Sequence, residues 1–333
     1  MEQANVDLIH REGKGKLSYQ GSVAHKLLAN DFDVNGLRTN DTLLYDEWKA
    51  IDTAVIKEAQ QRLNAVNMLI GRGLTYNIPN GLSKTVLAYQ DMSDIEEAEV
   101  NMDGISKGRR DRPEYDISYL PLPIFHKDFS FTAREIAASR NGNMPLDTSM
   151  AELATRKVSE KIEEFVVVGS SNYTFGGGTI YGLLDAPNRN TGNLTAHWND
   201  SAASGTTIKT DVLDMKQELI DDRFYGPYGV WIPTAFETPL DDDYTTGYPK
   251  TIRSRLAEIA GVDNVTVVDT MTADNVVMFQ LSSDVVRIVI GLSIVTVEWD
   301  SEGGLRHNFK VMAIMVPQVR YTQALRSGIA HYS

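Results

Sequence analysis

Residues 147–169, DTSMAELATRKVSEKIEEFVVVG, constrain the fold more than any other stretch of the chain. Apolar side chains recur there at steps of three and four residues, which predicts one long amphipathic helix. Many α/β domains carry such a helix on their surface, so its role depends on the segments that flank it. The predicted apolar face consists of Met150, Ala154, Val158, Ile162 and Phe165, and the opposite face is charged.

Both ends of this predicted helix carry capping signals. Ser149 and Glu152 have the spacing of a capping box, with Asp147 and Thr148 as alternative N-caps. Gly169 stands where a left-handed C-terminal cap is expected.

The composition excludes several classes of protein. The 333 residues contain no cysteine, which rules out a disulfide framework and a cysteine nucleophile and suits an intracellular origin. A net charge of −13 argues against a protein that wraps nucleic acid, because such a surface needs a basic excess, although solubility alone also explains the charge. The first residues lack a signal sequence and no apolar stretch is long enough to span a bilayer, so no membrane partner is predicted.

The chain begins with a predicted N-terminal arm, residues 1–42, in which polar, glycine and short apolar stretches alternate without a period. Residues 43–83 are predicted as one helix followed by a turn. Asn40 or Asp41 can cap this helix, and Gly71 ends it.

Residues 84–118 are predicted to form a long hairpin with a highly charged tip. Two interpretations stay open: a solvated loop, or an arm that lies across a neighbouring subunit and is guided by charge complementarity. The acidic block of the tip contains Asp94, Glu96, Glu97 and Glu99, and the basic block contains Lys107, Arg109, Arg110 and Arg112.

From residue 201 the composition shifts toward helices and short strands. Residues 206–222 are predicted as a helix, residues 228–233 as a buried strand and residues 251–259 as a second helix. Apolar runs separated by Asp, Ser and Gly follow, VVRIVIG and SIVTVEW among them, which predicts a mixed sheet flanked by helices. The first of these helices has one apolar face, formed by Ile208, Val212, Met215 and Leu219.

No catalytic, cofactor-binding or metal-binding residue is predicted. The acidic run at residues 241–243 lacks the spacers and the glycine of a calcium loop. The three glycines at residues 176–178 lack the GxxxxGK[ST] pattern of a phosphate loop. A chain of this size without a site signature is predicted to be structural rather than enzymatic. Neither HExxH nor HxxxH spacing occurs among the six histidines, His10, His25, His126, His197, His307 and His331.

The order of these parts is similar to that of one family. YLPLPIFHKDFSFTARE leads into MAELATRKVSEKIEEFVVVG, and YGLLDAPN and GPYGVWIP follow. From about residue 43 onward the chain resembles the Hong-Kong-97-like fold of tailed-phage major capsid proteins. The segment DEWKAIDTAVIKEAQQRLNAVNML resembles the amino-terminal helix of the related encapsulin shells. The long N-terminal arm departs from the encapsulin pattern and favours a viral shell.

The resemblance implies an α+β fold in which residues 147–169 are the spine helix of a peripheral domain. The implied contacts between subunits use the two charge blocks of an extended loop together with Glu160, Glu163 and Glu164 on the polar face of the spine helix. The implied parts are an N-terminal arm (1–42), an N-terminal helix and turn (43–83), the extended loop (84–118), a peripheral domain with the spine helix (119–200), an axial domain (201–295), and C-terminal strands that return to the peripheral domain (296–333).

The implied function is self-assembly into the pentamers and hexamers of an icosahedral phage head that encloses double-stranded DNA without sequence-specific binding. Separate scaffold, portal or cement proteins would be further partners. The chain would be found in the virion capsid after assembly in the cytoplasm of the bacterial host, and no cofactor is implied. Two alternatives stay open: an encapsulin-type nanocompartment shell that holds a cargo enzyme, and an unrelated soluble α/β enzyme.

Overall fold

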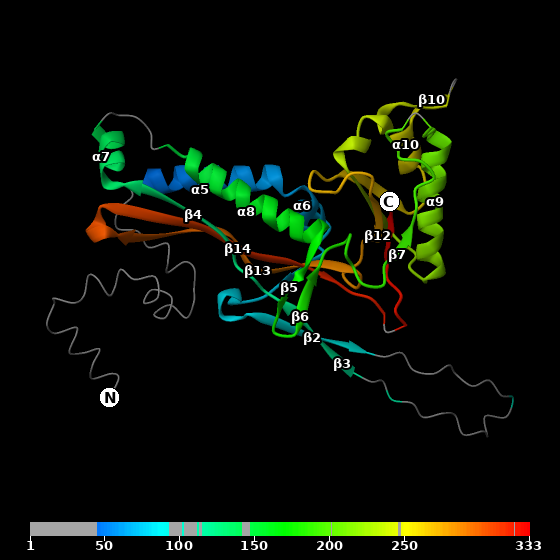
Figure 1. The fold of residues 1–333 in the computed structure, drawn as a ribbon, viewed down its shortest axis with the longest axis horizontal. Helices are drawn as coiled ribbons and strands as arrows, with labels where there is room; N and C mark the ends of the chain where they lie inside the picture. The colour runs from blue at the N-terminus through cyan, green and yellow to red at the C-terminus, as the bar shows by residue number, and fades with distance from the viewer. Residues whose placement is uncertain are drawn as a thin grey trace.

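The computed structural model describes residues 45–92, 102, 112, 115–141, 147–200, 202–245, 248–322 and 324–333. The described elements form an elongated lobe, a second lobe at one end of it, and a thin two-stranded ribbon that extends away from both (Figure 1). The elongated lobe contains α5 (Tyr45–Arg62), α6 (Asn64–Gly71), α7 (Ala133–Asn141), α8 (Ser149–Val167), β1 (Thr75–Asn77), η1 (Gly81–Ser83), β4 (Phe125–Thr132), β13 (Val286–Ser301), η4 (Glu302–Gly304) and β14 (Arg306–Val319).

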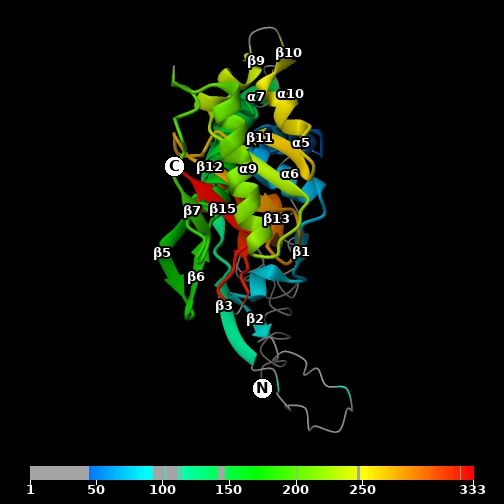
Figure 2. The same ribbon diagram turned by 90° about the vertical axis from the view of Figure 1, so that its right-hand side faces the viewer.

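The second lobe is built around a five-stranded sheet. Helix α9 lies across this sheet, as the end-on view shows (Figure 2), and it contacts β12 and β15. The lobe contains β7 (Asn190–Gly192), α9 (Gly205–Asp221), β8 (Tyr228–Ile232), η2 (Thr234–Phe236), η3 (Pro239–Asp241), β9 (Asp243–Thr245), β10 (Tyr248–Thr251), α10 (Ile252–Ala257), β11 (Val262–Val267), β12 (Val276–Gln280) and β15 (Ile329–Tyr332).

The spine helix is α8, and its apolar face forms the centre of the main core. Ala154, Val158 and Ile162 are buried, and Phe165 meets Phe125 of β4 edge-on with 5.0 Å between ring centroids. Burying a side chain such as Ile162 contributes roughly 2–3 kcal/mol. Met150 was predicted on this face but is 49% exposed, because the helix turns its neighbour Ala151 inward instead.

The start of α8 differs from the predicted capping box. Ser149 is the first helical residue, and its N–H donates to Asp147 Oδ1 at 2.9 Å. Thr148 is the N-cap by backbone geometry, but its hydroxyl donates to the Glu152 carboxylate rather than capping the backbone. At the other end, Gly169 has the expected left-handed conformation, with φ of +80°.

The predicted single helix at residues 43–71 is wrong. The structure breaks it at Leu63, where φ of −95° and ψ of 62° are not helical, so α5 and α6 are separate helices. Both helices turn apolar residues into the protein, including Ile51 and Leu69, which are fully buried. The physical reason for the break is a carboxylate of α8 that binds the first turn of α6, described below.

A four-stranded sheet with the order β1-β13-β14-β4 supports the two helices. The predicted strands VVRIVIG and SIVTVEW are one continuous strand, β13, whose pairing with β14 shifts register twice, between Ile290 and Val295. Gly291 lies at this irregularity, and a side chain on Gly81 would meet its carbonyl oxygen at 2.2 Å. The close approach of two backbones explains why both positions are glycine.

The five-stranded sheet has the order β11-β8-β12-β15-β7, and the predicted apolar face of α9 packs against it. The strand pairing corrects the domain limits that the resemblance implies. The chain crosses between the two lobes at residues other than 201 and 295. Strand β13 already begins in the elongated lobe at Val286. The final strand β15 pairs with β12 and β7 in the second lobe, so the C-terminal strands do not all return to the elongated one.

Candidate assembly interface

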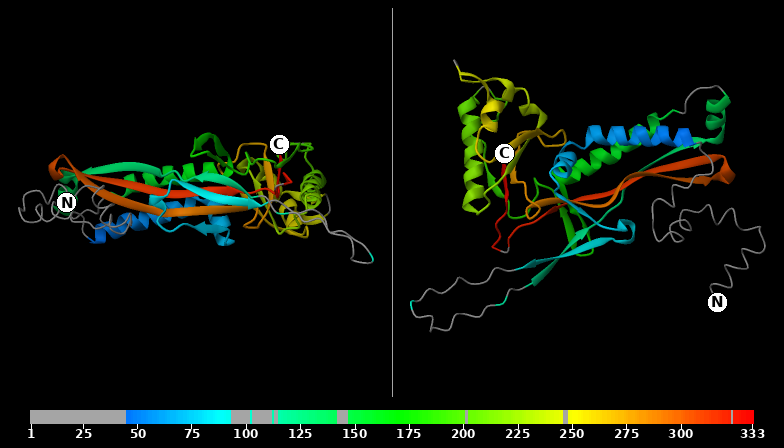
Figure 3. Two further views of the ribbon diagram at one scale, coloured as in Figure 1. Left: turned by 90° about the horizontal axis from the view of Figure 1, so that it is seen from below. Right: turned by 180° about the vertical axis from the view of Figure 1, so that it is seen from behind.

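Strands β2 (Val86–Met92) and β3 (Tyr115–Pro121) form the ribbon that extends from the molecule. They pair antiparallel in continuous register, from Val86 opposite Pro121 to Met92 opposite Tyr115. Among the described strands they pair only with each other. The view from behind shows that the ribbon extends beyond the two lobes (Figure 3).

One face of the ribbon is apolar and exposed. Tyr115, Ile117 and Tyr119 alternate along β3, so all three point to the same side, and they are 61%, 49% and 43% exposed. An isolated two-stranded ribbon is only marginally stable in water. An aromatic face on such a ribbon is typical of a surface that another chain covers.

The base of the ribbon is anchored by the hairpin of β5 (Gly169–Phe175) and β6 (Gly178–Tyr181). A side chain on Gly178 would lie 2.0 Å from the carbonyl oxygen of Tyr119, so only glycine permits this approach. Gly176 and Gly177 form the turn with positive φ. The three glycines therefore have a structural explanation, in the turn and in the contact with β3.

The charged tip of the predicted extended loop lies almost entirely outside the described residues. This applies to Glu96, Glu97, Glu99, Lys107, Arg109 and Arg110. Arg112 is described and exposed. The predicted role of these charges in contacts between subunits stays a prediction.

Two of the three spine-helix acids lie on the charged face, as expected. Glu160 accepts hydrogen bonds from Lys157 and Arg156 at 2.7 and 2.9 Å, and these bonds hold its pKa below the ordinary value. Glu164 pairs with Lys161 at 2.7 Å. Each acid thus has a basic partner on its own helix, and a basic residue from another chain would join an existing ion pair.

Glu163 corrects the prediction. It is only 2% exposed, because it lies on the arc of α8 that faces α6. Its carboxylate accepts the backbone N–H of Ala65 at 2.6 Å and that of Val66 at 3.4 Å. These N–H groups belong to the first turn of α6, where no side chain of α6 itself caps the helix. Glu163 therefore acts inside the subunit.

Burial raises the pKa of the Glu163 carboxyl to about 7. The hydrogen bonds from Ala65 and Val66 favour the charged form, and the negative charge of Asp269 opposes it. Helical spacing in the sequence already indicates that this position faces inward. Glu163 stands four residues after Ser159 and three before Val166, both of which are buried.

Three side chains that could bind a metal ion lie close together among the described residues, at the end of the elongated lobe that is far from the ribbon. Glu298, Asp300 and His307 lie together near the β13–β14 turn. No linear motif joins them, because strand pairing rather than sequence spacing brings them together. No helix among the described residues is both long and apolar enough to cross a membrane.

A protein-family model described as "Family of unknown function (DUF6260)" matches residues 38–332. The chain belongs to this family. The type 1 encapsulin shell protein EncA of Myxococcus xanthus (strain DK1622) is 20% identical to it over 280 residues, which cover 84% of this chain and 91% of that protein. This DUF6260 chain is thus similar in sequence to a shell protein over most of its length.

Solved structures show which fold this DUF6260 chain has. The virus-like particle from Pyrococcus furiosus matches with a TM-score of 0.60 and 18% identity, covering 87% of this chain and 99% of that one. The capsid of Myoviridae phage XM1 matches with a TM-score of 0.57 and 13% identity, covering 75% and 85%. The predicted α+β, Hong-Kong-97-like fold shared by tailed-phage capsid proteins and encapsulins is therefore confirmed.

Proposed function

We propose that this chain is a structural, shell-forming protein, and specifically a major capsid protein that self-assembles through pentamers and hexamers into the icosahedral head of a tailed phage. The observation that carries the proposal is the exposed apolar face of the β2–β3 ribbon, formed by Tyr115, Ile117 and Tyr119. Assembly of identical chains would cover this face, because each chain can offer its ribbon to the next.

The two lobes suggest how the chains would meet. The five-stranded lobe would be the axial domain, whose tips gather around the symmetry axes. The elongated lobe with α8 would be the peripheral domain, and the ribbon would be the base of an extended loop that reaches over the adjacent subunit. The two charge blocks of that loop support this arrangement, since opposite charges on neighbouring chains attract.

The net negative charge of the chain supports a shell that encloses DNA without binding it tightly. With a net charge of −13, an inner surface would enclose double-stranded DNA without strong binding to phosphates. In this proposal the protein resides in the virion capsid after assembly in the bacterial cytoplasm, and scaffold, portal or cement proteins are separate chains. The proposal includes no catalytic role and no cofactor.

The second candidate function is an encapsulin-type compartment that holds a cargo enzyme. Similarity to EncA over 91% of its length favours this alternative, as does the 99% coverage of the Pyrococcus particle chain. Both functions share the shell and differ in its contents.

Light scattering and negative-stain electron microscopy of the purified protein test the proposal. We expect large closed particles, and nuclease-protected DNA inside particles from the native source distinguishes a phage head from an enzyme-filled compartment. Only monomers or dimers, across salt and protein concentration, would contradict both shell functions and favour a soluble enzyme.

A further inference from the structure

Near the turn of the β13–β14 hairpin, three side chains that can bind a metal ion lie on one face of the sheet. Glu298 and Asp300 are two residues apart on β13, so their carboxylates point to the same side. The strand register pairs Asp300 directly with His307 of β14, which puts the imidazole on that side as well.

The three groups lie close enough to share one ion, although His307 and Asp300 are joined by a hydrogen bond in its absence. His307 Nδ1 lies 2.6 Å from Asp300 Oδ1 and 3.9 Å from Glu298 Oε1. One ligand atom from each residue lies within 4.8 Å of the other two. Bonds of about 2.0–2.2 Å from a tetrahedral Zn²⁺ ion put neighbouring ligand atoms about 3.4 Å apart, so a bound ion would replace the hydrogen bond between His307 and Asp300.

Burial makes this group different from a chance cluster of surface acids. Glu298 and His307 are each only 6% exposed, whereas the Asp300 side chain is 48% exposed. The group combines two carboxyl groups and one imidazole, which are oxygen and nitrogen ligands that Zn²⁺ accepts together. A buried carboxylate next to a second one is unfavourable, and a cation between them offsets that cost.

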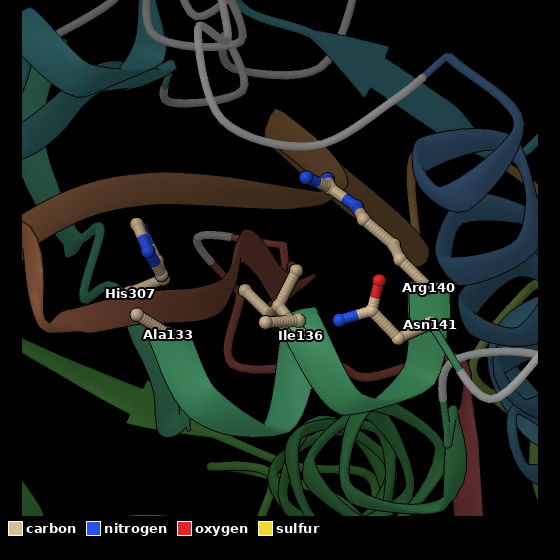
Figure 4. A pocket seen from close by; sticks show the side chains of 6 residues that line it. Ala133, Ile136, Arg140, Asn141 and His307 are labelled. Carbon is tan, nitrogen blue, oxygen red and sulfur yellow. The ribbon is translucent and has the colours of Figure 1, made fainter.

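A pocket of about 300 Å³ reaches His307, one of the three residues, from the side of α7. His307 rises from β14 at one edge of this pocket, and Ala133 and Ile136 of α7 line it beside the imidazole (Figure 4). Arg140 at the other end of the pocket is held by Glu47 through hydrogen bonds of 3.0 and 2.7 Å.

We propose that Glu298, Asp300 and His307 bind a divalent transition-metal ion of the Zn²⁺ class. The imidazole decides the class, since Mg²⁺ and Ca²⁺ take oxygen ligands whereas Zn²⁺ accepts nitrogen and carboxylate together. The ion would connect β13 to β14 beneath α7 and stabilise the end of the hairpin. The site is structural and needs no reaction.

The test is equilibrium dialysis and calorimetric titration of the purified full chain, treated with a chelator, against ZnCl₂ and MgCl₂. We expect saturable binding of about one Zn²⁺ per chain and no comparable binding of Mg²⁺. His307→Gln and Asp300→Asn should each weaken Zn²⁺ binding at least about tenfold, because each removes one of three ligands. Zn²⁺ should also raise the unfolding temperature of the wild type but not of these variants.

The matched control is His126→Gln. His126 Nδ1 lies 3.6 Å from Asp128 Oδ1, and both side chains are about half exposed, so this pair tests whether any His–Asp neighbour binds zinc. We expect unchanged Zn²⁺ binding in this variant. Asp300→Asn keeps the test decisive even if changes at buried positions prevent folding, since Asp300 is half exposed. Absence of saturable Zn²⁺ binding, or wild-type binding by Asp300→Asn, overturns the proposal.

Discussion

Glu163 of α8 and Ala65 of α6 are joined by a hydrogen bond of 2.6 Å between a buried carboxylate and a backbone N–H. This bond, with its longer companion to Val66, gives α6 the N-terminal cap that its own sequence lacks. One side chain of the spine helix thereby fixes where α5 ends and α6 begins.

Glu163→Ala is expected to lower the free energy of unfolding by roughly 2–3 kcal/mol, because two buried N–H groups lose their acceptor. Glu164→Ala on the same helix is the control, since its ion pair with Lys161 is exposed and should contribute less than about 1 kcal/mol. Denaturant unfolding of both variants checks this. Equal effects of the two substitutions would refute the capping role.

The raised pKa of Glu163 predicts how stability depends on pH. In the folded chain the carboxyl holds its proton up to a pKa of about 7, whereas in the unfolded chain it releases it near 4.5. Stability from this group is therefore complete below pH 4.5 and is lost as the pH rises to 7, by about 3 kcal/mol.

Glu163→Gln removes this titration and keeps an acceptor for Ala65. As the pH rises from 5 to 8, the unfolding temperature of the wild type should fall relative to that of Glu163→Gln. Thermal unfolding curves of the two proteins at several pH values measure it. A difference that stays constant with pH would show that Glu163 does not titrate in this range.

The apolar face of the ribbon should be needed for assembly and not for folding. Tyr115→Ser combined with Ile117→Thr and Tyr119→Thr is expected to reduce particle yield at least about tenfold, since burial of each side chain contributes on the order of 1–2 kcal/mol. Asp116→Ser, on the opposite face of the same strand, should assemble normally. Sedimentation separates particles from subunits, and circular dichroism verifies the fold.

The charge blocks of the extended loop give a further prediction. Replacing Arg109, Arg110 and Arg112 together by Ala should impair assembly more than subunit folding, because the loop loses its attraction to a neighbouring acidic surface. Replacement of the same arginines by Glu should be more severe. Adding Glu96→Arg, Glu97→Arg and Glu99→Arg to that variant should partly restore particles if the two blocks meet. If the alanine variant gives as many particles as the wild type, the prediction that these charges guide assembly is contradicted.

The sequence predicted the spine helix and the apolar face of α9 because both depend on local periodicity, and the fold class followed from the resemblance to one family. It failed where a distant side chain decides local structure. The stretch around Leu63 has no glycine or proline, and the carboxylate that caps the first turn of α6 lies 98 residues away in the sequence. The grouping of His307 with Asp300 was also hidden, because it arises from strand register across a turn.

A density map of the purified particle by electron cryomicroscopy tests the central claim most directly. The account predicts a closed shell in which Tyr115, Ile117 and Tyr119 of each ribbon lie against an adjacent copy of the chain and lose their exposure to solvent. A chain that forms no shell, or a shell in which this face of the ribbon remains in contact with water, would contradict it.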